Sequence, residues 1–201
     1  MAIGYEAGTA ITTGSSNVII GADAAEAMTE GHSSVIIGQN AGASLTTGNS
    51  VVFVGQAAGD GHDTETNNVG VGRAALGGAI AGGEYNVAIG NYSLDALTSA
   101  DKITAVGYQA GSAHTTGANC VFMGYQAGLA NTTGASIVAI GANAYDQADT
   151  ESHNIAIGND SMHGTVDGGE FNVAVGSNTL DALTSGDHNV AMGYNAGTTV
   201  S

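Results

Sequence analysis

A short apolar pattern that ends in glycine recurs along the whole chain, and its spacing constrains the fold more than any other feature. The pattern is an apolar residue, a small or apolar residue, a second apolar residue and then glycine, as in residues 87–90. Twelve copies follow one another in steps of 17 or 18 residues. The glycines are Gly4, Gly21, Gly38, Gly55, Gly72, Gly90, Gly107, Gly124, Gly141, Gly158, Gly176 and Gly193. A fixed period of this size is typical of stacked repeats, in which each unit covers the apolar face of its neighbour.

Seventeen residues are too few for a pair of helices but fit one coil of a parallel β-solenoid. We therefore expect an all-β fold, a single solenoid domain over residues 1–201 with about twelve coils of 17–18 residues. The first strand of each coil is the apolar triplet before the glycine. A second strand is expected around a further apolar residue, at Ile11, Met28, Leu45, Leu97 and Leu183.

A longer repeat of 86 residues lies over the 17-residue period. Residues 84–90 recur as residues 170–176, and residues 94–99 recur as residues 180–185. An offset of 86 residues equals five coils, so we infer that a five-coil block was duplicated. A duplication that keeps the phase of the coils lengthens a rod without changing its cross-section.

Alternation along each triplet decides which residues face the interior of the coil. We predict that the first and third residues face inwards, because they are mostly β-branched and suit a buried strand. The middle residue then faces outwards, yet none of the twelve is polar. An apolar stripe on a sheet face that should be solvated marks a contact surface. The predicted oligomer interface is Ala2, Ile19, Ile36, Phe53, Ala88, Ala105, Phe122, Ala139, Ala156, Ala174 and Ala191.

Copies of the chain that meet along this stripe would form a cyclic homo-oligomer of parallel rods. The alternative is a monomer whose stripe is covered by a terminal segment.

The net charge of the chain limits the other kinds of partner. The chain has 2 Lys and Arg and 18 Asp and Glu, which gives a net charge of −16. Such a surface repels nucleic acid and anionic lipid. No run of 18 apolar residues is present, so we expect no membrane insertion.

The repeat contains two motifs that resemble those of known families, NVAIG at residues 86–90 and GYQAG at residues 107–111. They resemble the head repeats of YadA-like trimeric autotransporter adhesins and similar repeats of bacteriophage tail fibres, over essentially the whole chain. The resemblance implies a left-handed parallel β-roll that forms a homotrimer. It also implies a rigid, non-enzymatic segment, located extracellularly on a virion fibre or cell surface, that attaches to a host-surface receptor or glycan.

The sequence departs from the adhesin pattern in three respects. Its coil is longer than is usual in adhesin heads, it lacks the apolar heptads of a coiled-coil stalk, and it lacks a C-terminal membrane barrel. The GYQAG motif favours a fibre of the phage type over an adhesin head.

Three sets of residues are candidates for contact with a ligand or metal. Tyr108, Tyr125 and Tyr194 are turn residues that could contact a receptor, although packing over the adjacent corner explains them as well. Clustered carboxylates in a loop suit Ca²⁺, and a solvated acidic turn is the alternative. The two sets of carboxylates, 86 residues apart, are Asp60, Asp63 and Glu65, and Asp146, Asp149 and Glu151.

No catalytic or cofactor-binding residue is predicted, and no cofactor is expected. No nucleophile or metal-ligand spacing recurs among the six histidines. An enzyme of the left-handed β-helix acyltransferase type is one alternative, but the apolar residue that this family repeats at every sixth position is found on only one side of the coil. An ice-binding solenoid is another, because Thr-Thr pairs recur, but adjacent threonines point to opposite faces. Cys120 is the only cysteine and cannot form an intrachain disulfide.

Overall fold

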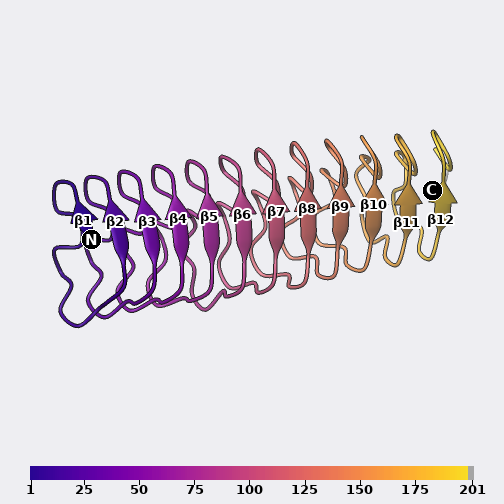
Figure 1. The fold of residues 1–201 in the computed structure, drawn as a ribbon. Helices are drawn as coiled ribbons and strands as arrows, with labels where there is room; N and C mark the ends of the chain where they lie inside the picture. Colours follow the sequence, from indigo (N-terminus) through magenta and orange to yellow (C-terminus); the bar gives the residue numbers. More distant parts are fainter. Residues whose placement is uncertain (199–201) are drawn as a thin grey trace.

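The computed structural model describes residues 1–198 and shows an all-β parallel β-solenoid of about eleven turns, as the period predicts. The described residues contain twelve strands and no helix, and the strands form one parallel sheet in chain order (Figure 1). The coils follow one another along a rod whose two termini lie at opposite ends. The strands are β1 (Ala2–Ile3), β2 (Val18–Ile20), β3 (Val35–Ile37), β4 (Val52–Val54), β5 (Val69–Val71), β6 (Val87–Ile89), β7 (Thr104–Val106), β8 (Val121–Met123), β9 (Val138–Ile140), β10 (Ile155–Ile157), β11 (Val173–Val175) and β12 (Val190–Met192).

Each strand pairs with the same triplet of the next coil, so the repeat is in register throughout. Ala88 on β6 lies beside Gly70 on β5 and Ala105 on β7. The predicted second strand is wrong, because each coil of the described chain has one strand and closes through turns and bends. Met28 and Leu45, which were expected on that strand, lie in the turn segment and are fully buried there.

The predicted orientation of the strands is also wrong, since the middle residue of each triplet faces into the coil. Ala88 is 0% exposed, whereas Ile89 beside it is 41% exposed. The same alternation holds from β2 to β11. The residues predicted as an interface are therefore core: Ile19, Ile36, Phe53, Ala88, Ala105, Phe122, Ala139, Ala156 and Ala174 are buried in one chain, Ala191 packs against them, and Ala2 is exposed in the first coil.

A buried asparagine explains this orientation. Asn86 lies two residues before Ala88, so alternation places both side chains on the same side of the strand. The Asn86 amide nitrogen donates to the carbonyl of Ala100 across the coil (2.9 Å), and its oxygen accepts the N–H of Ile103 in the next coil (3.0 Å). Asn172 makes the corresponding bonds in the second block. Since a buried amide needs such partners, the asparagine fixes the inward face and leaves Val87 and Ile89 outside.

A second inward position shares the core volume with the middle residue of the strand. It lies four residues after the repeat glycine. Where the strand carries phenylalanine, this position is glycine: a Cβ on Gly59 would lie 2.6 Å from the Phe53 ring, and one on Gly128 would lie 2.2 Å from the Phe122 ring. Beside five of the small strand residues, the position holds large buried side chains with φ between 50° and 57°, namely Leu76, Leu94, Tyr145, Met162 and Leu180. After Ala105 the position is Gly111, where an added Cβ would lie 2.7 Å from the Phe122 ring of the next coil. Large and small side chains at the two positions therefore complement each other within a coil or with the next coil, which keeps the core close-packed.

The repeat glycine is required by the approach of successive coils as well as by its backbone angles. Gly107 has a φ of 140°, a region that only glycine adopts readily. A Cβ at this position would lie 2.1 Å from the carbonyl oxygen of Gly124 in the next coil. A side chain there would push the coils apart and break the ladder on both sides.

We therefore predict that Gly107→Ala lowers the free energy of unfolding by at least about 3 kcal/mol, from backbone strain and from the clash with the next coil. Gly193→Ala is the matched control, because Gly193 has a φ of 121° but no atom within 4 Å of an added Cβ. The control should show backbone strain alone, about 1–2 kcal/mol. Denaturant unfolding measures both, and equal losses in the two variants would contradict the requirement for close approach.

Candidate functional site

The outward side of the sheet is an apolar surface that runs the length of the rod. It consists of the first and third residues of each strand, and we call it the sheet face. From β2 to β12 every one of these residues is Val, Ile or Met except Thr104, and none is charged. Ile89 and Met123 are the most exposed of them between β2 and β11, at 41% and 40%. A sheet face that meets water normally carries polar residues at such positions.

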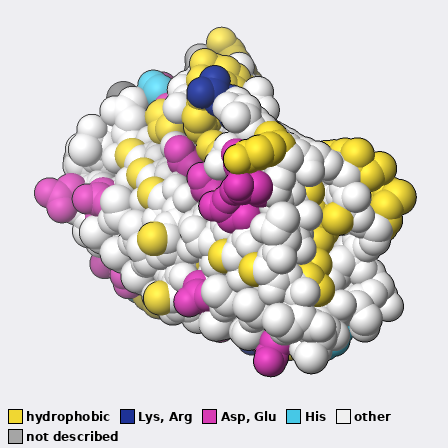
Figure 2. All heavy atoms as spheres, turned by 90° about the vertical axis from the view of Figure 1, so that its left-hand side faces the viewer, with side chains coloured by type: hydrophobic (Ala, Val, Ile, Leu, Met, Phe, Trp, Pro, Cys, Tyr) yellow, Lys and Arg dark blue, Asp and Glu magenta, His cyan; other side chains and the backbone are white. Residues whose placement is uncertain are grey.

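The sheet face is large for an exposed apolar surface. Twelve strands, of which eleven have three residues, span roughly 55 by 10 Å, on the order of 550 Å². That is at the upper end of the apolar patches that single chains expose, about 300–600 Å². Seen along the rod, hydrophobic side chains gather on one side of the molecule and acidic side chains lie on other parts of this view (Figure 2). The sheet face is therefore a large apolar surface without charged side chains.

These residues were expected in the interior of the coil, so the sequence did not indicate them as a surface. Two signals in the sequence could have reversed that assignment. The asparagine two positions before the middle residue recurs in six of the twelve coils, as at Asn86 and Asn172. The residue four positions after the repeat glycine is small where the middle residue is Phe and large beside several of the alanines, as at Gly59 and Tyr145. Both patterns link the middle residue to the interior.

Two of the three predicted contact tyrosines lie together on the surface. The rings of Tyr108 and Tyr125 stack at 5.6 Å between centroids, and Tyr92 meets Tyr108 edge-on at 6.2 Å. The Arg73 guanidinium lies 5.5 Å from the centre of the Tyr92 ring. Tyr108 and Tyr125 remain exposed, and so does Tyr194 in the last coil. The tyrosines pack against one another along the rod and still present their edges to solvent, so a role in ligand contact stays a prediction.

In the acidic turns that were candidates for calcium sites, the glutamate side chains accept hydrogen bonds from backbone N–H groups. One oxygen of Glu65 accepts the N–H groups of Asp63 (2.9 Å) and Thr64 (3.2 Å), and the other accepts the N–H of Gly82 in the next coil (3.0 Å). Glu151 makes the same three kinds of bond 86 residues later, to Asp149, Thr150 and Gly168.

Three of the four aspartates of these turns accept side-chain hydrogen bonds. Asp63 and Asp149 accept hydrogen bonds from the hydroxyls of Thr46 and Thr132. Asp146 accepts from His163 Nδ1 at 2.7 Å. In the described chain neither turn brings three of its carboxylates within ligating distance, and the glutamates cap the loop that carries the inserted residue.

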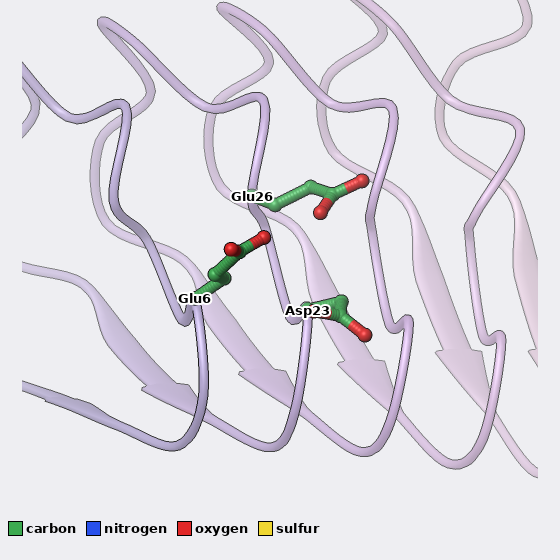
Figure 3. A group of neighbouring side chains, drawn as sticks. All are labelled: Glu6, Asp23 and Glu26. Atoms are coloured by element: carbon green, nitrogen blue, oxygen red, sulfur yellow. The ribbon is translucent and has the colours of Figure 1, made fainter.

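A different acidic group, which the sequence analysis did not single out, lies near the N-terminal end of the rod. Glu6 in the first coil and Asp23 and Glu26 in the second have carboxylate oxygens within 4.8 Å of one another (Figure 3). Glu6 and Asp23 are 17 residues apart, so the period places them at equivalent positions. Exposed acidic groups are common on a chain of net charge −16, and the cluster alone does not define a metal site.

In the Thr-Thr pairs that suggested ice binding, the first threonine donates its hydroxyl proton within the rod. The hydroxyl of Thr12 donates to the carbonyl of Thr29 in the next coil, and Thr29 and Thr115 donate in the same way. Cys120 occupies the same position of the coil as the buried asparagines, and burial raises the pKa of its thiol to about 11, so the thiol is neutral at physiological pH.

Comparison of the chain with protein-family models, with curated proteins and with solved structures found no match. Within residues 1–198 the structure has no helix long and apolar enough to span a lipid bilayer.

The capping role of Glu65 predicts a loss of stability on truncation. Glu65→Ala leaves three N–H groups without their acceptor and should lower the free energy of unfolding by about 3 kcal/mol, near 1 kcal/mol for each bond. Glu65→Gln keeps one acceptor oxygen and should lose less. Addition of Ca²⁺ to the wild-type protein should leave the unfolding midpoint unchanged, and a large upward shift with Ca²⁺ that is reduced in Glu65→Ala would show instead that this turn binds the ion.

Proposed function

We propose that the protein is a non-enzymatic structural segment of a fibre, of the phage tail-fibre or adhesin-head type, in which parallel copies pack through the sheet face into a rigid homotrimeric rod. The observation that carries this proposal is the unbroken apolar sheet face. A face of Val, Ile and Met that is long, in register and free of charge loses little conformational entropy when it packs, because β-branched side chains are already restricted at χ1.

The shape of the rod supports assembly of chains side by side. All twelve strands point the same way and keep one register, so two copies laid in parallel present matching rows along their whole length. Closed cyclic symmetry lets each chain bury its sheet face against its neighbours around one axis. A net charge of −16 on each chain opposes contact through the remaining surfaces, so the assembly stops at one closed ring of rods.

The trimeric state, the left-handed coil and the extracellular location follow from the resemblance to adhesin heads and tail fibres. Eleven steps of about 4.8 Å give a rod on the order of 50 Å long. Attachment to a host-surface receptor or glycan would use the exposed turns, with Tyr108 and Tyr125 as the proposed contacts because their edges reach solvent. The regular repeat makes a spacer and a display surface, which is what a fibre segment needs.

The assembly is tested with a pair of neighbouring substitutions. Ile89→Glu places a charge on the sheet face and should dissociate the trimer to a folded monomer, because a buried unpaired charge is costly. Ala88→Glu places the same charge in the core of a single chain and should disrupt the fold itself. Light scattering of the purified proteins gives the mass, and circular dichroism reports whether the fold is retained.

The wild-type protein is expected to have three times the monomer mass of 19.6 kDa. Tyr92→Glu serves as a surface control away from the sheet face and should keep the wild-type mass. A monomeric wild type, or a trimer that persists in Ile89→Glu, would contradict the proposed role of the sheet face.

A further inference from the structure

The two five-coil blocks fill the same part of the core with different side chains. The offset of 86 residues relates three inward positions of the fourth coil to three of the ninth. The first block uses Phe53, Gly59 and His62, and the second block uses Ala139, Tyr145 and Ala148. The first block therefore has a phenylalanine ring on the strand and an imidazole that faces it. The second block has one tyrosine in their place. This difference has a chemical consequence, because an imidazole titrates in mild acid and a phenol does not.

The surroundings of His62 fix its proton on Nδ1. The ring is fully buried and meets the Phe53 ring edge-on, with centroids 4.8 Å apart. The Asn68 oxygen accepts the N–H of Asn86 (2.9 Å), so the Asn68 amide nitrogen is the end that lies 3.3 Å from His62 Nε2. Nε2 must then accept, and the proton lies on Nδ1, which has no partner.

A second proton on this ring would have no acceptor. It would lie on Nε2, opposite the N–H of the Asn68 amide, while Nδ1–H stays without a partner. Glu65 is the charged group whose field favours protonation, and its carboxylate already binds three backbone N–H groups. The cationic ring is therefore badly accommodated in the folded state.

The tyrosine of the second block satisfies the same position without a titrating group. The Tyr145 hydroxyl accepts from the Asn154 amide nitrogen (2.7 Å) and donates to the carbonyl of Glu151 (3.2 Å). Asn154 corresponds to Asn68 by the same offset of 86 residues. Since burial raises the pKa of the Tyr145 phenol, the hydroxyl stays neutral throughout the acid range.

We propose that His62 is a pH-sensitive site in the core of the rod, and that its protonation in mild acid opens the coils around it while the corresponding coils of the second block stay closed. The opening separates the first three coils from the rest of the rod. It is a local event because each coil of a solenoid contacts only its neighbours, so a weakened coil opens without unfolding the whole chain.

The direction of the effect follows from the titration. Burial lowers the pKa of His62 from 6.5 to about 4, with Glu65 opposing. Because the folded value lies below the unfolded one, the neutral ring stabilises the fold fully above pH 6.5, and this stabilisation is lost as the pH falls from 6.5 towards 4. The equilibrium constant for opening should rise on the order of 70-fold between pH 7.5 and pH 4.5.

His114 is the matched control within the chain. It is also fully buried and lies against a phenylalanine, Phe122, at 5.2 Å. Both of its nitrogens face oxygen atoms, however: Nε2 faces the carbonyl of Gly117, and Nδ1 lies 2.9 Å from the Asn131 oxygen. Burial lowers the pKa of His114 as well, but the oxygens of Gly117 and Asn131 favour the protonated ring, which can donate both of its N–H groups. This ring should therefore contribute less to the acid sensitivity than His62.

Hydrogen–deuterium exchange measured by mass spectrometry at pH 7.5 and pH 4.5, with exchange times scaled for the intrinsic rate, tests the proposal in the full chain. Protection of residues 52–76 should fall about 70-fold in acid relative to residues 138–162, by the titration above. His62→Leu should remove this difference, since Leu45 and Leu97 occupy the same coil position. His114→Leu should leave the difference in place.

A second variant tests the proposal independently, in case His62→Leu does not fold. The triple substitution Phe53→Ala, Gly59→Tyr and His62→Ala transfers the side chains of the second block into the first and should give both blocks the same protection at both pH values. Equal acid sensitivity of the two blocks in the wild type would overturn the proposal. Acid sensitivity that persists in both His62 variants, or that disappears in His114→Leu, would overturn it as well.

Discussion

A buried asparagine amide that joins one coil to the next is the interaction on which the rest of the solenoid depends. In coils such as that of Asn86, the amide spans the interior with its nitrogen and holds the next coil with its oxygen. Strand alternation then turns the residue two positions later inwards and its neighbours outwards. The narrow core and the apolar sheet face both follow from this one orientation.

The period, and not the size of the side chains, was the reliable guide to the fold. Steps of 17 and 18 residues correctly predicted a parallel solenoid and a strand at each triplet. The interior was assigned wrongly because β-branched residues were expected to be the ones that are buried. Alternation turns one residue of each triplet inwards, and this is alanine in most coils and Ile19, Ile36, Phe53 or Phe122 in others, while the two flanking residues, mostly β-branched, lie outside.

The sequence correctly predicted an apolar stripe along the outside of the sheet, but it assigned this stripe to the wrong residues. A stripe without polar side chains exists on the outside of the sheet, as expected of an interface, but Val87 and Ile89 form it and not Ala88. The carboxylates near Glu65 could not be interpreted from spacing alone, because only the fold shows that three backbone N–H groups reach that side chain. The local sequence determines where each strand forms. The role of each side chain depends on the groups that it contacts in the neighbouring coils.

Exchange of side-chain amide protons, followed by NMR, tests the inward orientation most directly. The account predicts that the amide protons of Asn86 and Asn172 exchange with solvent orders of magnitude more slowly than those of Asn119, which is exposed. Exchange of Asn86 at the rate of Asn119 would mean that the asparagine row faces water, and the orientation of every strand would then be the reverse of the one described.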